Sequence, residues 1–129
     1  MTADIFELFE LIGYRDAPSL DGEAVVELPV APHVLNTNGG LQGGLLATLV
    51  DTAAGKLAMR LLPPGHSVVT SDLNLRYLRP VTDGAARAKA RVVHDGKRSM
   101  VVQVEISTSP GDELAVIATV CFAKILTRS

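Results

Sequence analysis

The sequence has little of what disulfide scaffolds or metal sites require. One cysteine, Cys121, is present among 129 residues, so no internal disulfide can form and we expect a reducing, cytoplasmic location. Because Cys121 lies in an apolar run, it is predicted to be a small buried side chain rather than a nucleophile. The histidines are scattered without the spacing of metal ligands, at His33, His66 and His94. We therefore expect no metal centre.

Charge of one sign is also lacking, since the formal net charge is -2. A nucleic-acid-binding protein would carry a basic surplus to neutralise phosphates, so we expect no nucleic-acid partner. The first ten residues are acidic where a signal peptide would be basic. The most apolar helical stretch, 45–50, is followed by Asp51 and Lys56, so no membrane span is expected. Hydrophobic residues make up 47%, enough for one soluble domain over residues 1–129.

The spacing of apolar residues predicts the elements of this domain. Helices are predicted at 2–12, capped by Thr2 and stopped by Gly13, and at about 41–62. The predicted strands cover 23–31, 68–78, 85–93, 99–107 and 114–126. The last strand is apolar on nearly both faces, which indicates a place inside the sheet. One long helix on an antiparallel sheet of about five strands is an α+β layer arrangement.

The third and fourth predicted strands form a hairpin whose register the side-chain pattern constrains. A three-residue loop, 95–97, would pair Val92 with Met100 and Arg87 with Glu105. That register aligns the apolar faces and sets opposite charges against each other. A two-residue turn would oppose charged and apolar faces, so the longer loop is predicted.

The segment from Asn36 to Asp51 carries the chemistry. Gly43 and Gly44 open the long helix, where backbone amides lack helical acceptors and lie at the positive end of the helix dipole. A carbonyl oxygen placed against them would be stabilised as it becomes an oxyanion. Asp51 is the only charge on a helix face of small residues, which consists of Gly44, Ala47, Thr48, Asp51, Ala54, Gly55 and Ala58. It is either a general base or nucleophile, or a carboxylate paired with an arginine at a subunit contact.

Residues 35–55 read LNTNGGLQGGLLATLVDTAAG. This stretch resembles the central motif of the PaaI-type (phenylacetate-pathway) thioesterases, in the hot-dog-fold 4-hydroxybenzoyl-CoA thioesterase superfamily. Further similar stretches are TSDLNLRYLRPV, DGKRSMVVQVEI and GDELAVIATVCFAKI. The resemblance covers nearly the whole chain in the family's order. It implies a hot-dog fold and an enzyme that hydrolyses acyl-CoA to a carboxylic acid and free coenzyme A.

The resemblance also implies the catalytic residues. Asp51 would activate water or attack the thioester carbonyl, and the amide of Gly43 would hold the thioester oxygen. Asn36 would orient the water or the thioester, and Thr70 would position the water or the carboxylate. In this family the site forms between two subunits, with the Asn and Gly from one and the Asp from the other. A homodimer at minimum, and by resemblance a homotetramer, is therefore expected.

Gln42 departs from the family, which usually has histidine there. Its amide can donate and accept hydrogen bonds but cannot titrate, so activity is expected if the histidine only orients groups and is reduced if its charge is needed. Coenzyme A carries phosphates, which require local positive charge. The candidate substrate contacts are Gly44, Arg76, Lys97 and Arg98, with Arg79 nearby. No cofactor is implied, because coenzyme A belongs to the substrate.

Other interpretations of these residues remain open. Asn36 could cap a turn, and Thr70 could be an ordinary strand residue. The absence of the usual histidine favours a hot-dog module that binds acyl-CoA without hydrolysing it, whereas the presence of Asp51 opposes that interpretation. A hot-dog hydratase would need a histidine close to an acidic residue, and the segment 36–51 contains none.

Overall fold

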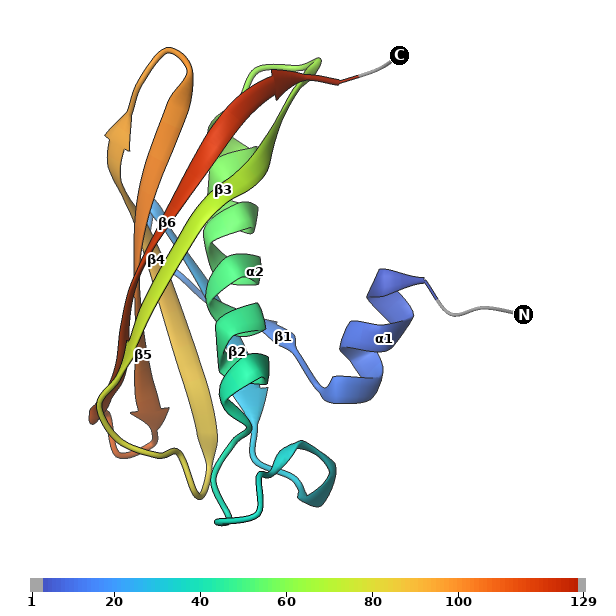
Figure 1. Ribbon diagram of the computed structural model, residues 1–129, viewed down its shortest axis with the longest axis vertical. Helices are drawn as coiled ribbons and strands as arrows, with labels where there is room; N and C mark the ends of the chain where they lie inside the picture. The colour runs from blue at the N-terminus through green and yellow to red at the C-terminus, as the bar shows by residue number, and fades with distance from the viewer. Residues whose placement is uncertain (1–3, 128–129) are drawn as a thin grey trace.

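The chain builds two helices and one antiparallel sheet. The computed structural model describes residues 4–127; Thr2, the predicted cap of the first helix, lies outside them. The elements are α1 (Ile5–Ile12), β1 (Arg15–Ala17), β2 (Glu23–Pro29), the short 3-10 helix η1 (Pro32–Val34), α2 (Gly43–Leu61), β3 (His66–Tyr77), β4 (Ala85–Asp95), β5 (Ser99–Ser109) and β6 (Leu114–Leu126). The sheet curves along one side of α2, and α1 lies on the other side (Figure 1).

The predicted α+β hot-dog arrangement is confirmed, with one strand more than expected. The strand order is β1-β2-β4-β5-β6-β3, with all neighbours antiparallel. The additional strand, β1, has three residues and lies between the predicted helix 2–12 and the predicted strand 23–31. As predicted, β6 is inside the sheet, between β5 and β3. The sheet therefore ends at β3 on the side that carries the candidate site.

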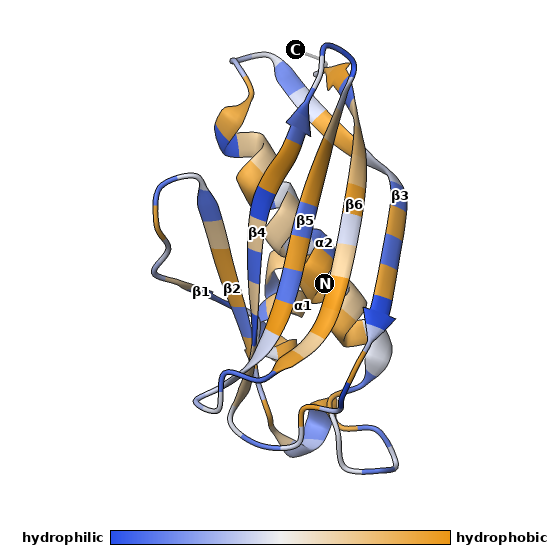
Figure 2. Cartoon of the chain, turned by 90° about the vertical axis from the view of Figure 1, so that its left-hand side faces the viewer, coloured by the Kyte–Doolittle hydropathy of each residue, from blue (hydrophilic) through white to orange (hydrophobic). Residues whose placement is uncertain are grey.

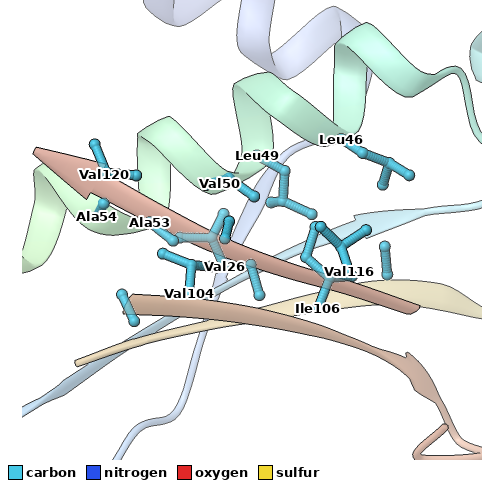
Figure 3. Packing of buried hydrophobic residues seen from close by; sticks show 14 of the residues in the cluster. Val26, Leu46, Leu49, Val50, Ala53, Ala54, Val104, Ile106, Val116 and Val120 are labelled. Atoms are coloured by element: carbon cyan, nitrogen blue, oxygen red, sulfur yellow. The ribbon is translucent and has the colours of Figure 1, made fainter. Parts of the chain in front are cut away.

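The core lies between α2 and the concave face of the sheet. Apolar side chains of the helix meet valines and an isoleucine of β2, β5 and β6 (Figure 3). Ala54 and Ala58, which were predicted to belong to the open face of small residues, are fully buried instead. The reason is that α2 packs against five strands, so the curved sheet buries a wider stripe of the helix than a flat one would. Asp51 and Gly55 remain outside that stripe.

The predicted register of the β4–β5 hairpin is wrong by two residues. Val92 lies opposite Val102, and Lys89 lies opposite Glu105. The turn lies further along the chain than predicted. A bulge between Val92 and His94 leaves one residue of β4 without a partner in β5, and because of it the apolar faces of the two strands still align. Glu105 still faces a basic residue, which is Lys89 rather than the predicted Arg87.

Helix α1 is well capped but makes few contacts. The Asp4 carboxylate accepts a hydrogen bond from the Glu7 amide at 2.8 Å, and Gly13 ends the helix with a left-handed φ of 116°. None of its residues is buried. The His33 ring nitrogen Nε2 lies 2.9 Å from the carbonyl oxygens of both Leu11 and Ile12, so His33 fastens the end of α1 to η1.

The outer face of the sheet carries polar side chains along β4 and β5. Alternating hydrophilic and hydrophobic residues run along β4 and β5 (Figure 2). Arg87 and Arg91 are exposed there and face Glu27 and Gln103 respectively. Cys121 in β6 is half-buried rather than buried as predicted. No helix among residues 4–127 is long and apolar enough to cross a membrane.

Candidate functional site

Asp51 projects from the middle of α2 and is held by one strand residue. The hydroxyl of Thr70 donates a hydrogen bond to the Asp51 carboxylate at 2.7 Å. The structure thus brings together two residues that are 19 positions apart. The ion pairs within residues 4–127 do not include Asp51, so within one chain the carboxylate keeps an oxygen available for other groups.

A bulge in β3 determines which of its side chains face the helix. Thr70 lies opposite Phe122, whereas Asp72 lies opposite Cys121, so Ser71 is the additional residue. Before the bulge the helix-facing residue is Thr70, and after it the helix-facing positions have odd numbers. Tyr77 is one of these, and Arg76 therefore points to the opposite face of the sheet.

The amino terminus of α2 presents free backbone donors. Gln42 is its N-cap, and the side-chain oxygen Oε1 accepts a hydrogen bond from the Leu45 amide at 2.8 Å. The hydrogen bonds among residues 4–127 leave the amides of Gly43 and Gly44 unused. Two donors at the positive end of a helix can hold an oxyanion, and the use of Gly43 for this stays a prediction.

Tyr77 is a site residue that the sequence analysis missed. Its hydroxyl donates a hydrogen bond to the carbonyl oxygen of Gly43 at 2.6 Å, which joins the end of β3 to the first residue of α2. A Cβ atom at Gly43 would lie 3.5 Å from the Tyr77 oxygen, an ordinary contact distance. The only signal available was the position of Tyr77 in β3, and the bulge at Ser71 reverses the faces that simple alternation would give.

Asn36 has the turn-capping role that was left open. Its side-chain oxygen accepts hydrogen bonds from the amides of Asn38 at 2.8 Å and Gly40 at 3.2 Å. The side chain is exposed and lies beside a cavity of about 570 Å³. This cavity, called here the glycine cavity, is lined by Asn36, Leu41, Gly43, Gly44, Leu46, Tyr77, Leu78, Arg79 and Pro80.

Asp51 does not line the glycine cavity. It lines a second cavity of about 430 Å³, called here the aspartate cavity, which lies between α1 and α2. Gly43 and Asp51 are eight residues apart on one helix, which separates them by about 12 Å along the helix axis. One thioester carbon cannot contact both groups at that distance. A single chain thus holds both halves of the predicted site without joining them.

The predicted contacts to coenzyme A are also spread apart. Arg76 lies on the outer face, and Arg79 lines the glycine cavity with its guanidinium bound to Glu113 and to the Leu114 carbonyl. Lys97 and Arg98 are exposed in the β4–β5 turn, which in Figure 1 is at the end of the molecule opposite the start of α2. Within one chain these basic residues form no common patch.

Tyr14 supplies a fixed polar atom beside the aspartate cavity. Its hydroxyl donates to the carbonyl oxygen of Leu45 at 2.6 Å. Burial raises the pKa of Tyr14 to about 12, which a hydrogen bond with Thr48 opposes only in part. The hydroxyl therefore stays protonated through the neutral range and remains a donor, which fixes the ring against the wall of the cavity.

The fold and these two cavities define an α+β hot-dog protein with an acidic residue in mid-helix and free amides at the helix start. Residues 38–115 match the model of the thioesterase superfamily. The chain is 31% identical over 100 residues to a 1,4-dihydroxy-2-naphthoyl-CoA hydrolase of Listeria monocytogenes, covering 78% of this chain and 81% of that one. The chain therefore belongs to the thioesterase superfamily, and the predicted enzyme class, a thioester hydrolase, is confirmed.

Solved structures give the same result. A Bacillus halodurans protein crystallised with CoA superposes with a TM-score of 0.85 and 37% identity, covering 92% of this chain and 76% of that one. The PaaI protein of the Escherichia coli phenylacetic acid degradation operon has a TM-score of 0.81 and 27% identity, covering 92% and 83%. Matches to several kinds of thioesterase support the superfamily as a whole.

Proposed function

We propose that this protein is a PaaI-type acyl-CoA thioesterase whose active site is shared between two subunits. Asp51 and Thr70 of one subunit would face Gly43, Gly44 and Asn36 of the other. The observation that carries this proposal is the separation of the glycine cavity from the aspartate cavity within one chain. A second copy supplies the missing half of each.

The edge strand β3 is the element that can bring the second copy into place. It borders β6 on one side only, and eight of its twelve residues are exposed in the single chain, while none is buried. Exposed apolar side chains on an unpaired edge favour pairing with another strand. Thr70 and Tyr77 mark the two half-sites on this strand. A twofold axis midway between them, near Leu73, would set Thr70 of one chain opposite Tyr77 of its partner.

The reaction then follows from the residues that surround the thioester. The amides of Gly43 and Gly44 hold the carbonyl oxygen and stabilise the charge that develops on it. Asp51 either takes a proton from a water molecule that attacks the carbonyl carbon, or attacks that carbon itself. With Asp51 as the base, the carbon–sulfur bond breaks after water has added, and the sulfur takes up the proton that Asp51 removed and leaves as the thiol of coenzyme A. With Asp51 as the nucleophile, the carbon–sulfur bond breaks as an anhydride forms between Asp51 and the acyl group. A water molecule then hydrolyses this anhydride, which releases the carboxylic acid and supplies the proton that the sulfur gains. Thr70 holds the carboxylate in position, and Asn36 orients the water or the thioester.

Gln42 fits this scheme as a neutral group. Its side chain caps α2 through the Leu45 amide, so it holds the helix start in place without carrying a charge. Arg76, Lys97 and Arg98 remain candidate contacts for the phosphates of coenzyme A, contributed from both subunits. A homotetramer and a cytoplasmic location remain predictions, as does a single domain spanning residues 1–129.

The test of the shared site is complementation between two inactive variants. Asp51→Asn removes the carboxylate and should abolish thiol release from acyl-CoA, while Gly43→Pro removes the backbone donor and should do the same. When the two variants are unfolded together and refolded at equal amounts, half the dimers are mixed, and each mixed dimer has one complete site of two. About a quarter of the wild-type activity should therefore return for a twofold-symmetric dimer.

The outcomes separate the shared site from its rivals. No recovery, with each variant folded and dimeric by circular dichroism and sedimentation, would show that one chain supplies the whole site. If Asp51→Asn keeps full activity, the assignment of the carboxylate is wrong. Tight binding of acyl-CoA by wild-type protein without any thiol release would identify the non-hydrolysing binding module.

A further inference from the structure

The aspartate cavity is larger than the catalytic groups require. Asp51 occupies one wall, and the rest is formed by α1, the following residues 14–16, Val26 of β2 and one side of α2. Its volume of about 430 Å³ lies within the range of pockets that hold small molecules. The reacting carbonyl carbon must lie beside Asp51. The nearest enclosed space for the acyl group attached to that carbon is therefore this cavity.

Gly55 keeps this cavity open. It lies one helical turn after Asp51 and lines the same cavity. A Cβ atom at Gly55 would meet nothing within 4 Å, so no packing contact requires glycine here. Its φ is not in the left-handed region, so the backbone does not require glycine either. A glycine in mid-helix lowers the stability of the helix by about 1 kcal/mol relative to alanine. What glycine provides in return at this position is open space in the cavity.

Aromatic side chains of α1 and of the residues that follow it form part of the cavity wall. Phe6 and Phe9 line it together with Tyr14, whose ring packs edge-on against Phe9 with centroids 5.1 Å apart. Phe6 is 75% exposed although it is aromatic. Such a side chain, beside a cavity that contains the candidate catalytic carboxylate, is suited to contact an apolar ligand. Charged residues also line the cavity, and two of them, Lys56 and Asp16, form an ion pair.

We propose that the aspartate cavity binds the apolar acyl group of the thioester, with Gly55 setting its depth and Phe6 and Phe9 forming its outer wall. This assignment rests on the proposed function, because it places the scissile carbonyl at Asp51. Helix α1 is thus a specificity element: none of its residues is buried, and it covers the substrate. The preferred substrates carry a bulky apolar acyl group rather than an acetyl group.

The test measures how tightly the protein binds stable thioethers of CoA that carry a methyl, a hexyl or a benzyl group. Wild-type protein should bind the hexyl or benzyl thioether more tightly than the methyl one. Gly55→Leu should reduce this preference about tenfold or more, because the new side chain fills the cavity. Its melting temperature should not fall, since leucine favours helix and enters open space.

A matched pair of variants on α1 completes the test. Phe6→Ala should weaken the preference for the bulky groups, whereas Leu11→Ala, on the same helix and 71% exposed but outside the cavity, should leave it unchanged. A preference for bulky groups that neither Gly55→Leu nor Phe6→Ala alters would overturn the proposal. The proposal would also be overturned if Leu11→Ala weakened the preference for bulky groups as much as Phe6→Ala does.

Binding and turnover are measured separately, so that the two proposals fail separately. If wild-type protein releases no thiol from any acyl-CoA but its binding preference responds to Gly55→Leu, hydrolysis is wrong and the acyl cavity stands. If thiol is released and the preference ignores both cavity variants, the hydrolase stands and the acyl cavity is wrong.

Discussion

At the scale of single residues, the hydrogen bond between Thr70 and Asp51 is the most direct link between geometry and activity. Thr70 donates through its hydroxyl at 2.7 Å. Hydrogen bonds to a charged group contribute about 1.5–3 kcal/mol, and part of that should appear in the transition state. Thr70→Val should therefore lower kcat about tenfold, measured as thiol release from a saturating acyl-CoA.

The control for this variant is Thr70→Ser, which keeps the donor and should recover most of the lost kcat. Because Thr70 is exposed, both variants should unfold within about 1 kcal/mol of wild type in urea. If valine and serine lower kcat equally, Thr70 acts through packing in β3 and not through its hydroxyl.

Some residues of the candidate site could be predicted from the sequence and others could not. Thr70 was assigned through the family resemblance, since a threonine in a strand has no signal of its own. Tyr77 was not found, because alternation from Thr70 predicts that even-numbered residues face α2, and the bulge at Ser71 reverses this after one position. The prediction of Arg76 rested only on its positive charge near the end of a strand. A bulge depends on how the partner strand β6 pairs, and no local pattern in β3 encodes that.

At the scale of elements, the start of α2 is held from two sides. The Gln42 side chain caps the helix by accepting a hydrogen bond from the Leu45 amide, and the Tyr77 hydroxyl links the Gly43 carbonyl to β3. The carbonyl of Gly43 and the amide of Gly44 belong to one peptide group, so the Tyr77 hydroxyl also orients a donor of the proposed oxyanion site. Tyr77 is thus a positioning residue.

Tyr77→Phe tests this role, because phenylalanine keeps the ring and removes only the hydroxyl. A net hydrogen bond of about 0.5–1.5 kcal/mol predicts a fall in kcat of about three- to tenfold. KM should change little if the donor matters most in the transition state. Steady-state kinetics on one acyl-CoA gives both values. A rise in KM at constant kcat would show that Tyr77 serves ground-state binding of the substrate instead.

The elements themselves were largely predictable, and their register was not. The apolar periodicity of 41–62 and the almost continuous apolar run within 114–126 predicted α2 and β6 nearly to the residue. The three-residue β1 is too short for any period to show. The predicted register of the β4–β5 hairpin was wrong because the bulge at Val93 depends on how β4 pairs with β5. The alignment of the apolar faces of β4 and β5 was nevertheless predicted correctly, because only one face of each strand can point into the core.

At the scale of the whole molecule, the chain leaves two half-sites and one unpaired edge. The half-sites meet the same strand, β3, at Thr70 and at Tyr77. Two apolar residues of this strand, Val69 and Leu73, are 48% and 38% exposed. In an antiparallel pair of β3 strands these apolar side chains would be covered by the partner, and the two sheets would become one continuous sheet. Activity and assembly should then depend on the same edge.

Charged residues on an edge strand oppose pairing with another strand. The double variant Val69→Lys, Leu73→Lys should therefore sediment as a monomer and lose nearly all thiol release. Its circular dichroism spectrum should still show the wild-type proportions of helix and strand. The matched control is Leu20→Lys, which places the same charge on a side chain that is 76% exposed in the loop after β1. It should keep wild-type assembly and rate. A monomeric double variant with full activity would mean that one chain closes its own site, which the 12 Å or so between Gly43 and Asp51 along α2 argues against.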